Sequence, residues 1–234
     1  GSQGGADMVD ILLYLVERKS YFLLCQKPLM EIFEGMKTRS LRDIRPIIDE
    51  NFHREFDVDL EGEILEWFDS NLEIVLDISL VDQTMNVELK SELAILFARW
   101  CSFSEWRCWD ARLFLYVEPI IGRKIEDVDE FLEYSIWSEF ALELMNLVST
   151  EYSESVISDW MGRREKLGET MEPSEDPRIL PTMAAHRLAT ESLHEFLKSV
   201  QNEKNSLLIG REFLNSQLWK FDKLSMVEQV GANR

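Results

Sequence analysis

Two Glu-x-x-His pairs are the residues whose types and spacing point most directly to chemistry. The pairs are Glu50 with His53 and Glu191 with His194. On a helix, this spacing lets a carboxylate and an imidazole reach the same metal ion, and helical di-iron sites combine two such pairs with further glutamates. The pairs therefore raise the hypothesis of a metal-dependent enzyme, a di-metal oxidoreductase that binds iron or manganese.

The hydrophobic periodicity around the two pairs argues against a buried metal. Ligands of a metal in a helical bundle must point into the core. In both segments the predicted apolar face points away from the candidate ligands, so a solvated helix face is the simpler interpretation. We therefore expect no metal and no cofactor. The two apolar faces are Ile48, Phe52 and Phe56 in the first segment, and Ala185, Ala189, Leu193 and Phe196 in the second.

Other catalytic motifs are incomplete or missing in the sequence. His194 and Glu195 resemble the start of a zinc-protease motif, but Lys198 stands where the second histidine should be. The chain has no G-x-x-x-x-G-K-[ST], no G-x-G-x-x-G and no G-x-S-x-G motif. Cys101 and Cys108 have no histidine near them in the sequence that could act as a base. We therefore expect a protein that is not an enzyme.

The cysteines and the apolar runs indicate the compartment. The three cysteines, Cys25, Cys101 and Cys108, are an odd number without a C-x-x-C spacing, which is typical of buried thiols in a reducing compartment. The apolar run 11–16 is too short to cross a membrane and ends at charged residues. We therefore expect no membrane association and an intracellular location, either cytoplasmic or nuclear.

The charge of the chain restricts its partners. Asp and Glu number 44 against 25 Lys and Arg, giving a formal net charge of −19. Such a surface repels nucleic-acid phosphates and anionic lipids, whereas it attracts basic proteins and peptides. Glu126, Asp127, Asp129 and Glu130 lie at the start of a predicted central helix and are the acidic rim that we expect to contact a basic partner.

The apolar pattern predicts an all-α fold. Segment 128–148 shows it best, because its apolar residues extend around most of a helix and leave only a narrow polar edge, formed by Ser135, Glu139, Glu143 and Asn146. A helix of this kind needs neighbours on several sides, so we expect it at the centre of the fold. About ten helices with short connections fit an irregular multi-helix array of HEAT or armadillo type, or a single bundle. The same periodicity predicts helices over about 7–18, 59–80 and 86–100, and another that begins at Ser104. In the helix 59–80, Ile64 and Phe68 are predicted to point inward and Glu66 outward, and in the helix 86–100 the predicted inward stripe is Leu89, Leu93, Leu96, Phe97 and Trp100. No stretch predicts a strand.

One segment interrupts the helical pattern and suggests the domain organisation. Segment 168–181 holds three prolines and four acids and has little to bury, which is typical of a loop or linker. We expect residues 1–7 to be a vector-derived tail and residues 8–167 to form the main helical domain. Residues 182–230 then form a C-terminal helical pair that packs on this domain, with helices at 182–202 and 206–227.

The second helix of this pair is predicted to be apolar on two sides. One side is a normal inward stripe that includes Leu207, Phe213 and Leu218, and Leu208, Trp219 and Met226 gather on another side. A terminal helix with two apolar sides needs a second neighbour, and an exposed Trp is typical of an interface. Leu208, Trp219 and Met226 are therefore predicted partner-binding residues.

These patterns together predict a non-catalytic interaction module, a scaffold or adaptor subunit of an intracellular complex. It would bind partner helices or peptides, basic or amphipathic ones in particular, through apolar grooves with acidic rims. Two alternatives stay open: a structural homodimer through the C-terminal helix, and the di-iron enzyme described above.

Overall fold

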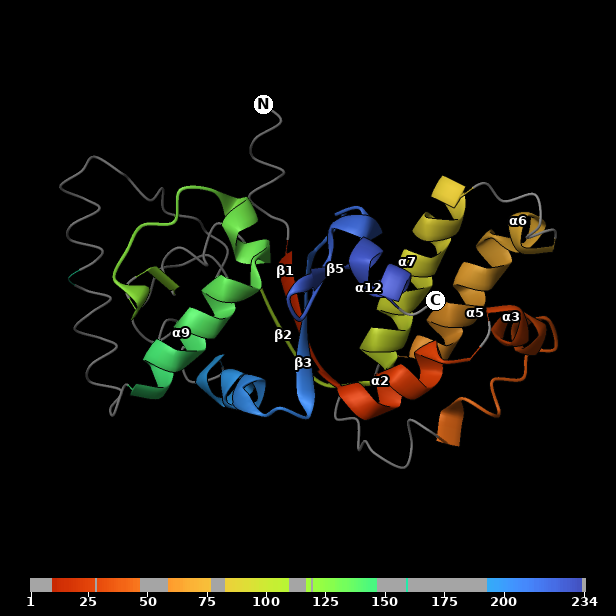
Figure 1. The fold of residues 1–234 in the computed structure, drawn as a ribbon, viewed down its shortest axis with the longest axis horizontal. Helices are drawn as coiled ribbons and strands as arrows, with labels where there is room; N and C mark the ends of the chain where they lie inside the picture. Colours follow the sequence, from red (N-terminus) through yellow and green to blue (C-terminus); the bar gives the residue numbers. More distant parts are fainter. Residues whose placement is uncertain are drawn as a thin grey trace, which may run out of the picture. The chain divides into compact units, whose positions relative to one another are not determined.

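The computed structural model describes residues 10–27, 29–46, 59–76, 83–109, 117–118, 120–146, 159 and 193–232. These residues form helices together with a five-stranded sheet in the order β2-β1-β3-β4-β5 (Figure 1). The prediction of an all-α fold is therefore wrong, and with it the helical array or bundle. The predicted tail, the predicted linker 168–181, and Glu50, His53 and Glu191 all lie outside the described residues.

Helices and strands are interspersed along the described chain. The strands are β1 (Asp10–Glu17), β2 (Ser102–Trp109), β3 (Asn205–Arg211), β4 (Lys220–Phe221) and β5 (Leu224–Ser225). The α-helices with defined bounds are α2 (Arg18–Cys25), α3 (Leu29–Lys37), α5 (Leu60–Ser70), α6 (Leu72–Leu76), α7 (Gln83–Trp100), α9 (Tyr134–Asn146) and α12 (Met226–Ala232). Three short 3₁₀ helices are η2 (Val128–Leu132), η3 (Ser199–Gln201) and η4 (Ser216–Leu218).

Strands β1 and β3 are buried on both faces. Residues 11–16 of β1 and 206–210 of β3 are all buried. Successive side chains of a strand point to opposite faces, so unbroken burial means that both faces are covered. An apolar run of this length has no alternation that would separate a strand from a short buried helix. This is why the sequence pattern around residues 11–16 predicted the start of a helix.

Strand β2 is less completely buried than β1 and β3. Ser102 and Trp106 are buried, residues 103–105 are half-buried and Arg107 is exposed. The preceding helix α7 ends at Trp100, and the backbone N–H of Cys101 donates to the carbonyl of Phe97 (2.8 Å). The predicted helix that begins at Ser104 is therefore replaced by a strand.

The C-terminal segment is a set of short antiparallel strands in place of the predicted helix 206–227. Leu208 lies opposite Phe221, and Phe221 lies opposite Leu224. The connection between β4 and β5 is a tight turn in which Asp222 has a φ of 57°, a conformation that Asp tolerates better than most residues. The inward stripe predicted for this helix is lost with it, because Phe213 is 97% exposed and Leu218 is 56% exposed.

The chain divides into two compact units. One unit contains residues 1–12 and 106–202, and the other contains residues 13–105 and 203–234. In the first unit, the polypeptide is extended at Glu133, between η2 and α9, so the predicted helix 128–148 is broken there.

The apolar pattern predicted for the part of this segment that forms α9 is confirmed for Ile136, Trp137 and Phe140, which are buried. Its predicted polar edge, Ser135, Glu139, Glu143 and Asn146, is exposed.

Trp137 is the centre of the core of this first unit. Its ring packs against those of Trp106, Phe131 and Phe140, with centroid distances of 6.3, 6.1 and 6.4 Å. Its indole N–H donates to the carbonyl of Phe131 (2.6 Å), which fixes the end of η2 against α9.

Helix α7 is the central element of the second unit. It packs against α2, α5, α12 and η4, and Figure 1 shows α5 and α12 beside it. The predicted inward stripe of α7 is buried at Leu89, Leu93 and Phe97, whereas Leu96 is only half-buried. Helix α5 is capped at its N-terminus by Asp59, whose carboxylate accepts a hydrogen bond from the backbone N–H of Gly62 (2.8 Å). As predicted, Ile64 and Phe68 of α5 are buried. The half-buried Leu96 marks the place where α5 and α7 leave a groove between them and the C-terminal segment.

Candidate functional site

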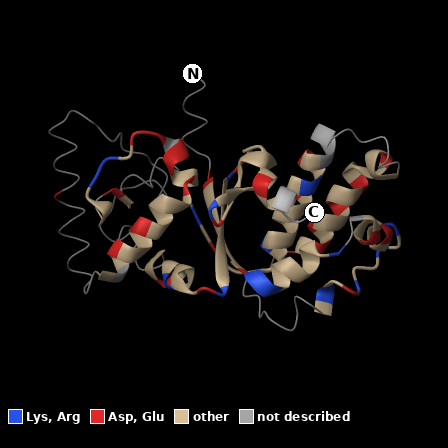
Figure 2. Cartoon of the chain, viewed as in Figure 1, with Lys and Arg blue, Asp and Glu red and all other residues tan. Residues whose placement is uncertain are grey.

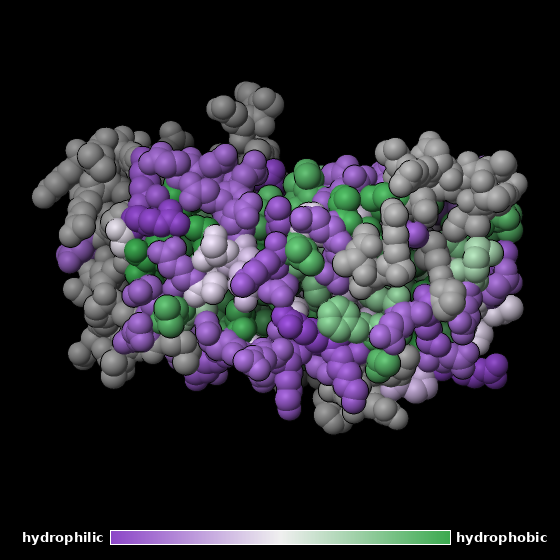
Figure 3. Space-filling view, in the orientation of Figure 1, coloured by the Kyte–Doolittle hydropathy of each residue, from purple (hydrophilic) through white to green (hydrophobic). Residues whose placement is uncertain are grey.

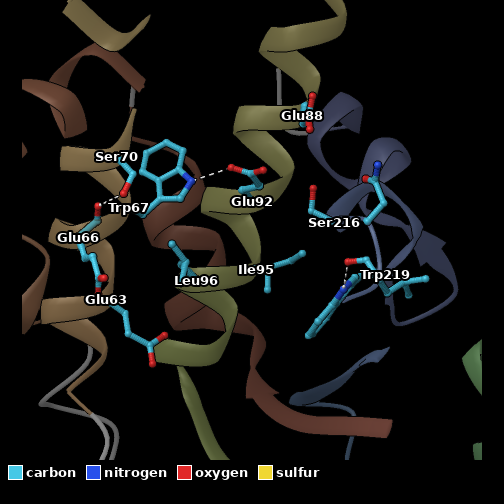
Figure 4. A pocket seen from close by; sticks show the side chains of 12 residues that line it. Glu63, Glu66, Trp67, Ser70, Glu88, Glu92, Ile95, Leu96, Ser216 and Trp219 are labelled. Atoms are coloured by element: carbon cyan, nitrogen blue, oxygen red, sulfur yellow. Dashed lines mark hydrogen bonds between the residues drawn. The ribbon is translucent and has the colours of Figure 1, made fainter. Parts of the chain in front are cut away.

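An open groove with a volume of about 740 Å³ lies in the second unit (Figure 4). Three segments line it: α5, α7 and the segment 214–219 that contains η4. The residues that line the groove are Glu63, Glu66, Trp67, Ser70, Glu88, Glu92, Ile95, Leu96, Leu214, Asn215, Ser216 and Trp219.

The helical repeat places these side chains on one face of each helix. In α7 the lining residues Glu88, Glu92 and Ile95 are spaced by four and three positions, and side chains at this spacing share a face. In α5 the residues Glu63, Glu66, Trp67 and Ser70 follow the same rule. Helix α5 thus turns a polar face with one aromatic residue to the groove, and α7 turns a face of acidic and aliphatic side chains to it.

Trp67 is held in place by contacts on two sides. Its indole N–H donates to Oε2 of Glu92 (2.7 Å), a bond that joins α5 to α7 and is drawn in Figure 4. The ring of Phe33 stacks on it, with a centroid distance of 6.3 Å and an interplanar angle of 24°. Trp67 is only half-buried, so this fixed indole remains partly open to a ligand in the groove.

Trp219 closes the groove on the side of the C-terminal segment. Its ring lies so close to Gly210 that a Cβ on that glycine would come within 2.2 Å of the indole. Tyr14 of β1 stacks on the same residue with a centroid distance of 6.5 Å. The indole N–H of Trp219 donates to the carbonyl of Leu214 (3.4 Å), a hydrogen bond between the last and the first residue of segment 214–219. A glycine is therefore required in β3 because the Trp219 ring occupies the space of a side chain.

One of the four carboxylates in the groove is neutralised within the protein. Nη1 of Arg99 lies 2.8 Å from Oε2 of Glu63, and its guanidinium lies over the Tyr14 ring, 5.5 Å from the centroid. Burial acts to lower the pKa of Arg99, but Tyr14 and Glu63 outweigh it and raise the pKa. Arg99 therefore stays charged at all ordinary pH values. Through its contacts with Glu63 and Tyr14, it connects the first turn of α5 to the stacked rings of Tyr14 and Trp219.

The other three carboxylates have no cationic partner among the described residues. Within the described structure, Glu66 and Glu88 form no ion pair, and the side chain of Glu92 accepts one hydrogen bond, from the neutral indole N–H of Trp67. The described residues that line the groove also include no Lys or Arg. Figure 2 shows that acidic residues recur along α5. Because like charges close together repel and the lining supplies no counter-charge, this groove is suited to a cationic ligand.

A hydroxyl in the groove is also unsatisfied within the described structure. Oγ of Ser216 is buried and has no hydrogen-bond partner there. The neighbouring Asn215 is occupied, since its Oδ1 accepts the backbone N–H of Gln217 (3.0 Å) and caps η4. Among the described residues that line the groove there is no His or Cys.

The structure buries all three residues predicted to bind a partner from the C-terminal helix. Leu208 and Met226 have no exposed surface and Trp219 is 7% exposed. Leu208 belongs to β3 and Met226 begins α12, so the two do not share an exposed helical face with Trp219. Only Trp219 lines the groove. The apolar residues that indicated a partner surface are part of the core of this unit.

The predicted acidic rim lies in the other unit, around η2. Glu126, Asp127 and Asp129 are exposed and Glu130 is half-buried. Asp127 caps η2 by accepting the backbone N–H of Asp129 (3.0 Å), and Glu130 accepts the N–H of Glu126 (3.2 Å). Nη1 of Arg123 lies 3.4 Å from Glu130. Part of this acidic cluster therefore has a local structural role.

No metal centre is found in the described part of the chain. There, no group of three or more His, Cys, Asp and Glu side chains is placed to hold a metal ion. His194 is described, and its Nδ1 lies 3.7 Å from the neighbouring Glu195, which also pairs with Lys198 (2.8 Å). Its predicted co-ligand Glu191 and the pair Glu50 and His53 lie outside the described residues.

Trp67 and Glu92 were missed by the sequence analysis. On the helical wheel, Trp67 lies at the edge of the apolar face of α5, among Glu63, Glu66 and Ser70. A large aromatic residue among acids at helical spacing was the available signal. The contribution of Leu214, Asn215 and Ser216 had no signal in the sequence, because it depends on the turn after β3.

Comparisons with known proteins add no identification. No protein-family model matches the chain, and no similar protein was found among the curated proteins or the solved structures. Every helix within the described ranges is too short or too polar to cross a bilayer. On the face seen in Figure 3, hydrophobic residues form separate small areas among hydrophilic ones.

Proposed function

We propose that this protein is a non-catalytic interaction module that binds a basic segment of a partner protein in the groove of α5, α7 and residues 214–219. One observation supports the proposal: a single groove is lined by two tryptophans and by three glutamates that have no cationic partner among the described residues. A scaffold or adaptor role in a complex would follow from such binding.

The chemistry of the groove favours Lys or Arg side chains. A cation over an indole face gains about 0.5 to 2 kcal/mol, the larger value when water is excluded. Carboxylates beside the ring add Coulomb attraction that is stronger in a partly enclosed groove than in bulk water. The aliphatic stems of Lys and Arg also suit the apolar parts of the lining, Ile95 and Leu96.

The overall charge favours the same type of partner and speeds its approach. With a formal net charge of −19, the protein attracts basic segments over distances of about one Debye length, roughly 8 Å at physiological salt. General attraction of this kind gives no specificity. A test must therefore separate the groove from the rest of the acidic surface.

The test compares two double charge reversals. Glu66→Lys with Glu88→Lys changes the groove, and Glu126→Lys with Asp129→Lys is the matched control, because it changes net charge equally at the predicted rim. The probes are fluorescent synthetic 15-residue peptides of Lys and Leu at helical or strand spacing, and fluorescence polarisation gives the dissociation constant. We expect the groove variant to weaken binding by about tenfold or more, and the control by less than about threefold.

The indole N–H signals of the tryptophans locate the bound peptide independently. In ¹⁵N-labelled protein, the signals of Trp67 and Trp219 should shift on titration, and single Trp→Phe variants assign them. Equal weakening by both charge reversals, without a shift of these signals, would leave only general charge attraction and reject the groove as the binding site. Stronger weakening by the control would place the site at Glu126 to Glu130.

A further inference from the structure

Phe213 stands out among the large apolar side chains of the described residues. It is 97% exposed, and the next value among them is 59%, for Leu76. Its φ is 61°, in the left-handed region that large side chains rarely adopt. Both the solvent exposure of the Phe213 ring and the backbone conformation of this residue are therefore energetically unfavourable. A residue in such a conformation persists only where the surrounding structure imposes it.

The loop that carries Phe213 is fixed by hydrogen bonds on both sides. The backbone N–H of Leu214 donates to the carbonyl of Arg211 (3.2 Å), which closes a turn around Phe213. Beyond it, the N–H of Leu218 donates to the carbonyl of Asn215 (2.9 Å) to form η4. Phe213 is therefore presented to solvent by an ordered turn, and little conformational entropy would be lost on binding there.

This turn is continuous with the groove. Leu214, Asn215 and Ser216, which directly follow Phe213, form one of its sides. Because Phe213 is the chain neighbour of Leu214, it is within reach of a peptide that extends beyond this side of the groove. The groove supplies carboxylates and indoles, and Phe213 adds an apolar contact beyond its edge.

We infer that Phe213 is an apolar anchor for the same partner segment, which must then be amphipathic, with an aliphatic or aromatic side chain beside its Lys or Arg residues. This inference rests on the proposed function, and it adds the apolar half of the recognition. Exposed aromatic residues that become buried on binding dominate the affinity of many interfaces.

The test removes the side chain without straining the turn. Phe213→Gly suits a positive φ, so the fold should be retained or become more stable. Phe213→Asn is a second variant that tolerates this conformation. Phe22→Ala is the control, since Phe22 is an exposed phenylalanine of α2 in the same unit. The probes are the Lys–Leu peptides and matched peptides in which every Leu is replaced by Ser.

We expect Phe213→Gly and Phe213→Asn to weaken binding of the Lys–Leu peptides by about tenfold and binding of the Lys–Ser peptides by less than about twofold. Phe22→Ala should change neither. The charge reversal of Glu66 and Glu88 should weaken both peptide types. Unchanged Lys–Leu affinity in both Phe213 variants would overturn the anchor while leaving the proposed function in place. If no peptide binds the wild-type protein, both proposals are overturned.

Discussion

The indole N–H of Trp67 and Oε2 of Glu92 are 2.7 Å apart, and this hydrogen bond joins the two helices that form the acidic side of the groove. It also aims one carboxylate at an aromatic residue that is only half-buried. The bond therefore serves both the packing of α5 on α7 and the geometry of the candidate site.

Replacing Trp67 by Phe tests the energetic value of this bond. Phe keeps much of the stacking on Phe33 and loses the donor, so Trp67→Phe should lower the free energy of unfolding by about 1 kcal/mol. A double-mutant cycle with Glu92→Ala, measured by urea unfolding, isolates the pair. We expect a coupling energy of about 1 kcal/mol, and additive effects of the two substitutions would mean that the bond contributes nothing to stability.

Gly210 and Trp219 form a second close contact that can be tested. A Cβ at Gly210 would lie 2.2 Å from the indole, so Gly210→Ala must displace the ring or the strand. We expect a loss of about 1 to 3 kcal/mol in unfolding free energy, the range typical of overpacking. The NMR signal of the Trp219 indole N–H should move as well. Gly122→Ala is a useful comparison: nothing lies near its Cβ position, and only the positive φ of 73° is strained. A Gly210→Ala variant with wild-type stability and an unmoved Trp219 signal would contradict the packing.

Leu208 and Leu218 distinguish the observed strands from a helix over 206–227. In the structure Leu208 is fully buried in β3 and Leu218 is 56% exposed, the reverse of their roles in the predicted helix. Leu208→Ala should therefore cost about 2 to 5 kcal/mol and Leu218→Ala less than about 1 kcal/mol. Urea unfolding of the two variants provides the comparison. A larger loss for Leu218→Ala than for Leu208→Ala would contradict the strands and support a helix over 206–227.

Cys25 should make stability depend on alkaline pH. Burial raises the pKa of its thiol from an ordinary value of 9.0 to about 11, although the neighbouring Tyr21 opposes part of the shift. The folded state thus holds the proton more tightly than the unfolded state, so the contribution is complete below pH 9 and is lost as the pH rises towards 11.

At pH 10 the wild-type protein should have lost roughly 1 kcal/mol of stability through this group, relative to pH 8. Cys25→Ala removes the contribution, so the variant should lose less stability than the wild type over the same interval. Urea midpoints at the two pH values, in the presence of a reductant, give the comparison. Identical pH dependence of both proteins would show that the thiol titrates normally.

The sequence was most informative where one helix packs on one apolar face. The buried residues of α5, α7 and α9 follow from the 3.6-residue period, since side chains three and four positions apart share a face regardless of what covers them. The acidic surface likewise follows from composition, and Glu66 was correctly predicted to point outward on α5.

The sheet could not be read in the same way. In β1 every residue from 11 to 16 is buried, so the run carries no period-2 signal, and its neighbour β3 lies almost 200 residues further along the chain. Local pattern does not report pairing over such a separation. The helix predicted over 206–227 failed for a related reason, because its apolar residues were grouped by a period that the backbone does not adopt.

By itself, the sequence determined which faces of the long helices are buried and that the surface is strongly acidic, because both depend on residues close together in the chain. Only the tertiary structure decided that Leu208, Trp219 and Met226 are core residues and that the groove exists. The groove joins Trp67, Glu92 and Ser216, which come together only when α5, α7 and the turn after β3 pack on one another. Contacts between such distant residues are set by long-range packing, which local periodicity does not encode.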